Sequence, residues 1–238
     1  MATDDGTASW REALHRQLQA IPPQRRRQLR SYAPVEAPAT LQASHGALLD
    51  LASNDYLGFS RHPAVVAAAQ AAAATEGVGA GASRLVSGGR PVHADLEAAL
   101  AIWLGRERVL LFSSGFQANL AAVCGLADRH SLVLADRLIH HSLLVGVRAS
   151  GAGLQRFHHN DLHHLEQKLQ AARRRRPDQR LLVISEGLFS MQGTSPDVAR
   201  LAHLCERSGA ALLLDEAHAL GVLGPGGRGL GHGINGIA

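Results

Sequence analysis

Several residue types that define common protein classes are scarce in this chain. Aromatic residues make up 4% of the sequence, too few for a protein that stacks nucleic-acid bases. The two cysteines, Cys124 and Cys205, are far apart and form no CxxC pair, which argues against a disulfide scaffold or a zinc knuckle and favours a reduced, cytoplasmic protein. No apolar run reaches the ~18 residues of a membrane span. Lysine occurs once, as Lys168.

The composition is otherwise that of a globular protein. The 238 residues are 46% hydrophobic and 18% charged, enough to bury a core. The formal charge of +4 comes from arginine, which is concentrated in the runs 25–27 and 173–176. These runs are expected to be solvated helix ends, because a nucleic-acid patch would need more such clusters and interleaved aromatic residues.

Short apolar runs alternate with helical patterns over the second half of the chain. Strands are predicted at 109–112, 132–135, 154–157, 181–184 and 210–214, with helices at 116–127, 141–149, 161–175 and 197–207. Continuous apolar strands separated by helices are typical of a parallel sheet that is covered on both faces. The sequence therefore predicts an α/β fold with a mostly parallel sheet.

The first half shows a different pattern. The spacing of Trp10, Leu14 and Leu18 predicts a helix over 9–31 that Pro22-Pro23 interrupts, followed by a connecting arm at 33–45 and a short strand at 47–52. Further helices are expected from Pro63 and over 93–105, on either side of a glycine-rich loop at 77–91. We expect residues 1–45 to form an N-terminal helix and arm, and residues 46–238 one large domain.

Polar residues follow four of the predicted strands. They occupy 113–116, 136–140, 185–190 and 215–218. Ligands of such folds bind beyond the carboxyl ends of the strands, so this concentration of polar groups at one edge predicts a ligand site there.

Each of these strand ends admits a functional and a structural interpretation. Gly115 opens a helix whose free N–H groups suit an anion, although Ser114 is also an ordinary helix cap. Asp215 ends the most apolar strand and would stay ionised beside a cation such as a protonated ring nitrogen, or it caps the next turn. His140 suits stacking on a flat cofactor, or is a structural histidine.

The histidine pairs 140–141, 158–159 and 163–164 are not expected to bind metal. Adjacent side chains point to different sides, so a pair does not provide two ligands of one ion.

Seven segments together resemble a known family: SNDYLGFSRHP, GAGASRLVSGGRPVHADLE, LLFSSGFQAN, ADRLIHHSLLVG, RFHHND, SEGLFSMQGTSPD and DEAHALGVLGPGGRG. They are similar to the α-oxoamine synthases, which are fold-type-I pyridoxal phosphate (PLP) enzymes that condense an amino acid with an acyl thioester. The motifs look most like the branch that joins L-alanine to a pimeloyl thioester of CoA or acyl carrier protein, with decarboxylation, in biotin biosynthesis. The resemblance implies a homodimer when the protein is full length. With the composition, it leads us to expect a cytoplasmic protein with neither nucleic acid nor a membrane as a partner.

The resemblance also implies roles for individual residues. Gly115 and Phe116 would meet the cofactor phosphate, and His140 would stack on the pyridine ring and assist with the substrate. Asp215 would pair with the ring nitrogen and keep it protonated, so that the ring withdraws electrons. Ser190 and His218 would contact the cofactor through its phenolic oxygen. The substrate side is assigned to Arg30, Asn54 and Arg84, with Arg27 as an alternative to Arg30.

The chain departs from the family in one respect. The lysine that holds the cofactor lies some thirty residues after the DEAH motif in the family, whereas this sequence ends at Ala238 and its one lysine, Lys168, lies in a polar helix. We therefore expect an inactive N-terminal portion without the C-terminal small domain. The alternatives are a family member that uses glycine or serine, and a non-catalytic partner subunit.

Overall fold

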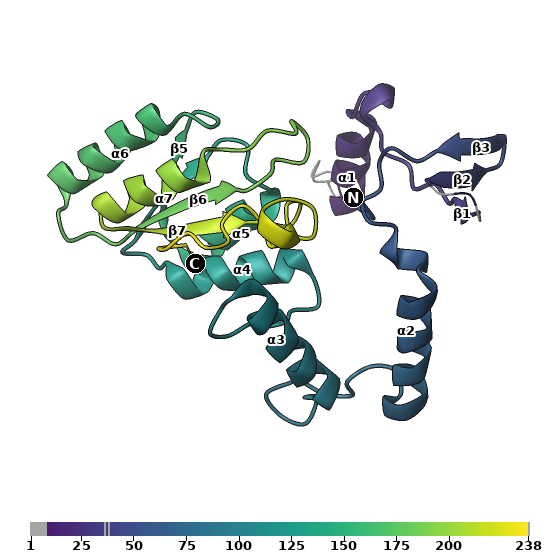
Figure 1. The fold of residues 1–238 in the computed structure, drawn as a ribbon. Helices are drawn as coiled ribbons and strands as arrows, with labels where there is room; N and C mark the ends of the chain where they lie inside the picture. Colours follow the sequence, from purple (N-terminus) through teal and green to yellow (C-terminus); the bar gives the residue numbers. More distant parts are fainter. Residues whose placement is uncertain (1–8, 36, 38, 238) are drawn as a thin grey trace, which may run out of the picture. The chain divides into compact units, whose positions relative to one another are not determined.

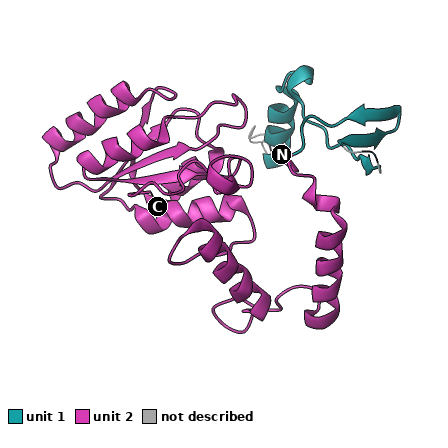
Figure 2. Ribbon diagram, viewed as in Figure 1, with its two compact units in different colours: residues 1–53 teal, residues 54–238 magenta. Residues whose placement is uncertain are grey.

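The computed structural model describes residues 9–35, 37 and 39–237. They form two compact units, residues 1–53 and 54–238 (Figure 2). The division comes later than the boundary expected after residue 45, because the third strand of the chain pairs with the second.

The described residues of the first unit form one α-helix, one short 3-10 helix and a small antiparallel sheet. Its elements are α1 (Trp10–Gln19), a short 3-10 helix (Pro23–Arg25), β1 (Ala33–Pro34), β2 (Thr40–Ala43) and β3 (Gly46–Leu49). The expected helix over 9–31 is wrong beyond Gln19, because a residue before proline disfavours helical geometry and Pro22-Pro23 follows almost at once. The expected arm instead holds the first two strands of the sheet β1-β2-β3.

The second unit begins with two long helices and continues as alternating helices and strands (Figure 1). In chain order its elements are a 3-10 helix (Phe59–Arg61), α2 (Pro63–Glu76), α3 (Pro91–Leu104), α4 (Gly115–Leu126), β4 (Leu132–Asp136), α5 (His141–Ser150), β5 (Gly153–Phe157), α6 (Leu162–Arg175), β6 (Leu181–Glu186), α7 (Val198–Arg207), β7 (Ala210–Asp215) and a 3-10 helix (Pro225–Gly227).

The four long strands form one parallel sheet in the order β5-β4-β6-β7. Val133, Leu182 and Leu213 point to the face covered by α4 and α5. Leu134, Val183 and Leu212 point to the other face, against α6 and α7 (Figure 1). The predicted α/β fold with a covered parallel sheet is confirmed.

The strand expected at 109–112 does not form. Leu110 and Phe112 are 67% and 42% exposed, and no strand of the described residues pairs with this segment. A strand needs a hydrogen-bonding neighbour, so an apolar run alone is not enough. Within the described residues, no helix combines the length and the apolar character that a membrane span requires.

Candidate active site at the carboxyl edge of the sheet

Three carboxylates lie at the carboxyl ends of three neighbouring strands. Asp136, Glu186 and Asp215 end β4, β6 and β7, and Glu186 is the register partner of Asp215. Parallel pairing brings these ends to one edge, as the sequence pattern predicted. The result is a concentration of negative charge beside the loops that follow each strand.

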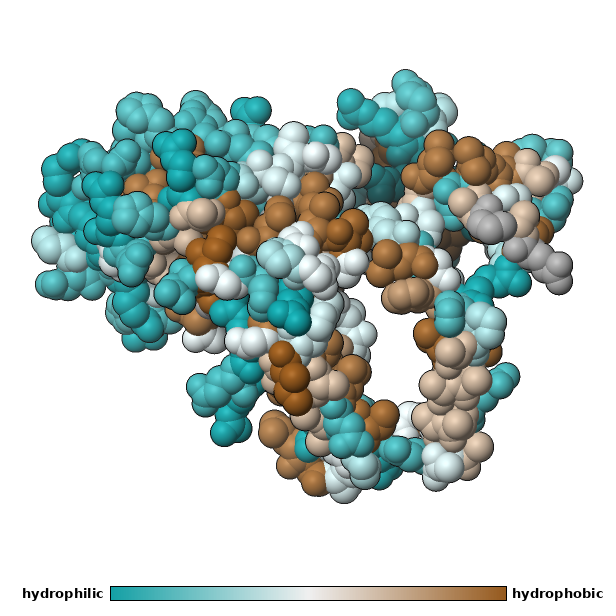
Figure 3. Space-filling model, in the orientation of Figure 1, coloured by the Kyte–Doolittle hydropathy of each residue, from teal (hydrophilic) through white to brown (hydrophobic). Residues whose placement is uncertain are grey.

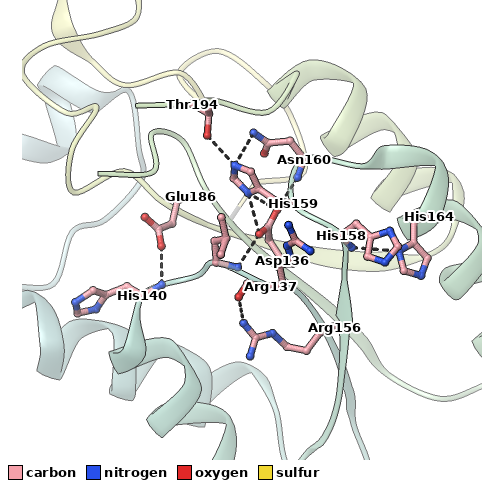
Figure 4. Close-up of polar contacts among 11 residues, drawn as sticks. Asp136, Arg137, His140, Arg156, His158, His159, Asn160, His164, Glu186 and Thr194 are labelled. Carbon is pink, nitrogen blue, oxygen red and sulfur yellow. Dashed lines mark hydrogen bonds and ion pairs between the residues drawn. The ribbon is translucent and has the colours of Figure 1, made fainter. Parts of the chain in front are cut away.

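This arrangement raises the pKa of Glu186 from 4.5 to about 7. Burial of the carboxyl group is the main cause, and the charges of Asp215 and then Asp136 add to it, while a hydrogen bond from His140 N opposes it. That bond is 2.6 Å long and ends on Glu186 Oε1 (Figure 4). Glu186 therefore fixes the backbone of the loop that presents His140 and is poised to take up or release a proton near neutral pH.

Asp215 is held by donors from two other elements. Asn119 Nδ2 of α4 donates to Asp215 Oδ2 at 2.8 Å, and Ala217 N donates to Asp215 Oδ1 at 2.9 Å. The hydrogen bond from Ala217 N caps the turn after β7, which is the structural role that the sequence analysis considered for this aspartate. The half-buried carboxylate is oriented by the amide of Asn119 as well.

A hydrogen-bond chain connects Asp215 to His140. Asn119 Nδ2 also donates to Ser142 Oγ at 2.9 Å, and Ser142 Oγ lies 2.7 Å from His140 Nδ1. Ser142 N donates to the same ring nitrogen at 3.3 Å, so Nδ1 is an acceptor and the neutral ring carries its proton on Nε2. Two of the predicted site residues are thereby joined through Asn119 and Ser142.

The start of α4 offers free backbone donors. Ser114 caps the helix by accepting a hydrogen bond from Gln117 N. The N–H groups of the first two helical residues, Gly115 and Phe116, belong to exposed residues. A Cβ added to Gly115 would meet nothing within 4 Å. An anion can therefore approach these N–H groups at the positive end of the helix.

His218 belongs to a second cluster of polar side chains. Its Nδ1 lies 2.7 Å from the hydroxyl of Tyr56, and that hydroxyl donates to Asn54 Oδ1 at 3.3 Å. The structure thus brings the predicted residues Asn54 and His218 together. Ser190 is exposed in a turn of the hairpin that Phe189 and Thr194 close.

The two predicted arginines are placed differently. Arg84 makes a double contact with Glu97, at 2.7 and 3.0 Å, and a third bond to Leu111 O. This pairing lowers the pKa of Glu97 to about 2 and links the glycine-rich loop to α3. Arg30 and Arg27 are exposed residues of the first unit.

Sequence reasoning missed four residues of this site. Asn119 and Ser142 lie inside helices, Tyr56 in a turn, and Glu186 at a strand end where only its position drew notice. Glu186 had a usable signal, because a carboxylate directly after an apolar strand is desolvated. Asn119 and Ser142 had none, since a single sequence does not show which helix faces which strand end.

Comparison with known proteins gives a consistent picture. Residues 47–232 match the family model described as aminotransferase class I and II. An 8-amino-7-oxononanoate synthase of Acidithiobacillus ferrooxidans is 46% identical over 217 residues, which are 91% of this chain and 52% of the relative. The enzyme of the same name from Klebsiella pneumoniae is 49% identical over 181 residues, or 76% of this chain and 46% of the relative.

Solved structures extend the likeness. A serine palmitoyltransferase of Sphingomonas wittichii superposes with a TM-score of 0.84 at 29% identity, covering 94% of this chain and 56% of that one. The 8-amino-7-oxononanoate synthase of Francisella tularensis gives 0.64 at 29% identity, covering 78% and 50%. The chain spans about half the length of the relatives it matches. Within that family its relatives are α-oxoamine synthases, to which it is similar, as its motifs predicted. Because the family model covers most of the chain, this chain belongs to the aminotransferase class I and II family.

Proposed function

We propose that this chain forms the cofactor-binding part of a PLP-dependent acyltransferase that condenses L-alanine with a pimeloyl thioester, with decarboxylation, to give 8-amino-7-oxononanoate. Its similarity to synthases of that name supports the reaction. The observation that carries the proposal is the hydrogen-bond chain from Asp215 through Asn119 and Ser142 to His140, because it holds an anion and an imidazole at the same strand ends.

The residues present fit pyridoxal phosphate. The exposed N–H groups of Gly115 and Phe116 suit the phosphate, and the open space at Gly115 leaves room for it. The oriented carboxylate of Asp215 suits a protonated ring nitrogen. Burial is the main cause that raises the pKa of Glu186, and a cation there would offset the charge of Asp215, which adds to that effect. When bound, the cofactor supplies an electron-withdrawing ring.

The protein's own groups then have defined tasks. Asp215 would keep a proton on the ring nitrogen of the bound cofactor, and Asn119 keeps the Asp215 carboxylate in place. Ser142 occupies Nδ1 of His140, which leaves Nε2 for a hydrogen bond to substrate and the exposed ring for stacking. His218 is oriented by Tyr56 for contact with the phenolic oxygen of the cofactor, and Ser190 is assigned to the same oxygen.

Lys168 has no part in this proposal. It lies on α6, which covers the face of the sheet opposite α4 and α5. The substrate roles of Arg30, Asn54 and Arg84, the homodimer and the cytoplasmic location stay predictions. Serine is a second candidate for the amino acid, because serine palmitoyltransferases superpose with higher TM-scores than the Francisella tularensis synthase.

Pyridoxamine 5′-phosphate provides the test, because it occupies such a site without a lysine. Calorimetric titration of the full chain should give saturable binding that weakens more than about tenfold in Asp215→Asn, since a hydrogen bond to a charged group contributes ~1.5–3 kcal/mol. Asp178→Asn is the matched control, because Asp178 is exposed just before β6, at the opposite edge of the sheet, and the charge change is the same.

A second variant separates ligand binding from folding. In Gly115→Asp the new carboxylate favours the helix N-terminus but repels a phosphate, so binding should be lost while the unfolding midpoint is kept. Binding that survives both Asp215→Asn and Gly115→Asp contradicts the assignment. Titration of L-alanine and of L-serine into the chain with the cofactor analogue bound decides between these two candidate amino acids.

A further inference from the structure

One histidine from each of two histidine pairs meets a carboxylate just after β5. His158, Asp161 and His164 each offer a ligand atom, and these atoms lie within 4.8 Å of one another. The local fold causes this, because Asn160 takes a left-handed conformation with φ +54° and Asp161 N donates to His158 O at 3.1 Å. The turn folds His158 back over the first turn of α6. Ligands three and six residues apart therefore meet, although the adjacent members of each pair do not.

The distances suit an ion better than a hydrogen bond. His158 Nδ1 lies 3.7 Å from Asp161 Oδ2, which is too long for a hydrogen bond. Two ligands of one tetrahedral ion lie about 3.4 Å apart when each bond is about 2.0–2.1 Å. The rings of His158 and His164 lie next to one another, with centroids 4.0 Å apart (Figure 4). His158 is the exposed member of the three, so a small shift of its side chain would bring the ligand atoms closer to one ion.

Asp161 caps α6 with one carboxylate oxygen, and its other oxygen can bind an ion. Its Oδ1 accepts from His164 N at 2.9 Å as the cap of α6, while Oδ2 faces His158. The positive helix terminus and Lys168 oppose a bound cation here, and the carboxylate offsets them. The helix cap and the ion would thus use different oxygens of one side chain.

His164 is ready to bind metal. Its Nδ1 accepts a hydrogen bond from His158 N at 3.1 Å, so this nitrogen carries a lone pair and no proton. Metal binding at Nδ1 would then replace this one hydrogen bond from a backbone N–H.

We propose that His158, Asp161 and His164 bind a divalent transition-metal ion such as Zn²⁺, with water completing the coordination. Two imidazoles and one carboxylate suit Zn²⁺, Co²⁺ or Ni²⁺, whereas Mg²⁺ and Ca²⁺ prefer a shell of oxygen ligands. The site lies outside the proposed cofactor site but belongs to the same loop system. His159, between two of the ligands, contacts both oxygens of Asp136 at 3.1 and 3.2 Å, and Asn160 N donates to Asp136 at 2.8 Å (Figure 4).

The ion would therefore clamp the turn that covers the end of β4. A ligand that binds only the folded state raises its stability by mass action. We expect Zn²⁺ to raise the unfolding midpoint of the full chain, without any requirement for the cofactor.

The experiment uses the full chain without a polyhistidine tag. Co²⁺ is titrated while its visible absorption is followed, and Zn²⁺ is titrated by calorimetry. One equivalent should bind, and affinity should fall more than about tenfold, or ~1.4 kcal/mol, in His158→Ala and in Asp161→Asn. Asparagine still caps the helix, so Asp161→Asn keeps the fold and removes one ligand charge.

His163→Ala is the matched control. His163 is adjacent to His164 but exposed and paired with Gln167 at 3.0 Å, so its loss should leave binding and the Zn²⁺-dependent midpoint unchanged. The proposal is overturned if the chain does not bind one equivalent of Co²⁺ or Zn²⁺. It is also overturned if His158→Ala and Asp161→Asn bind as tightly as the unchanged chain, or if His163→Ala weakens binding as much as they do, because the ion would then be held by other histidines.

Discussion

Two helices of equal length, α3 and α6, show what decides burial in this chain. Each has 14 residues, and α3 is largely apolar whereas α6 is largely polar. Yet α3 buries none of its residues, while α6 buries Leu165, Leu169 and Ala172. Figure 3 shows the corresponding surfaces, hydrophobic around α3 and mainly hydrophilic over α6.

The difference lies in spacing and not in composition. The buried residues of α6 recur every three to four positions and form one stripe against the sheet. The apolar residues of α3 are spread around the helix. The proposed functional groups follow the same division, since the strand-end carboxylates and His140 are attached to the buried sheet, and Arg84 to the exposed α3.

The largest expected effect tests this division with one substitution at two places. Leu165→Ala, at a fully buried position, should lower the free energy of unfolding by about 2–5 kcal/mol, since it leaves a cavity. Leu96→Ala in α3, where the leucine is 47% exposed, should cost less than about 1 kcal/mol. Denaturant unfolding measures both. Equal losses would show that α3 is as tightly packed as α6.

The sheet could be predicted from the sequence almost to the residue, because its strands are apolar runs between helical patterns. The run VLLF at 109–112 shows the limit, since it reads like the others but has no strand beside it. Pairing partners are a property of the whole fold, and one sequence does not reveal strand order. The positions of Asp215 and His140 at the edge of the sheet could be predicted, because each follows from its own apolar run. Asn119 and Ser142, which join them, could not.

The second prediction compares the two edges of the sheet. Asp136, the last residue of β4, is fully buried and accepts hydrogen bonds from Leu138 N, Asn160 N and His159. Asp136→Asn places an NH₂ group against one of these donors and should cost about 1–3 kcal/mol. Asp128→Asn, before β4 and about half exposed, is the control and should cost clearly less in the same unfolding assay. A loss at Asp128 as large as that at Asp136 would contradict the view that the carboxyl edge is the rigid one.

The third prediction concerns pH. Folding raises the pKa of the buried Glu186 carboxyl group from 4.5 to about 7. Between these values the folded state holds a proton that the unfolded state has lost, so stability falls as pH rises from about 4.5 to about 7. The contribution is about 1–2 kcal/mol, since one pKa unit corresponds to about 1.4 kcal/mol and solvent screens part of the shift.

Glu186→Gln should remove this slope while keeping an oxygen to accept from His140 N. Unfolding curves of both proteins across pH 4–8 measure the difference between them, in which the other titrating groups cancel. If the difference is flat, folding does not raise the pKa of Glu186, and neither its burial nor the charges of Asp215 and Asp136 act on it as the structure implies.

The smallest expected effect lies on the exposed side of the comparison. Arg84 ties the glycine-rich loop to Glu97 and to Leu111 O, but its side chain is 37% exposed, and such pairs add little to global stability. Arg84→Ala should therefore leave the unfolding midpoint unchanged within error. It should speed amide hydrogen exchange locally, at 79–90 and at Leu111, whose N–H is bonded to Glu97 Oε1 at 2.8 Å. Mass spectrometry of peptides from these segments measures the effect, with peptides of β4 and β6 as internal controls. Faster exchange in the strands as well would mean that the loop and α3 unfold together with the sheet, and that the two regions form one cooperative unit.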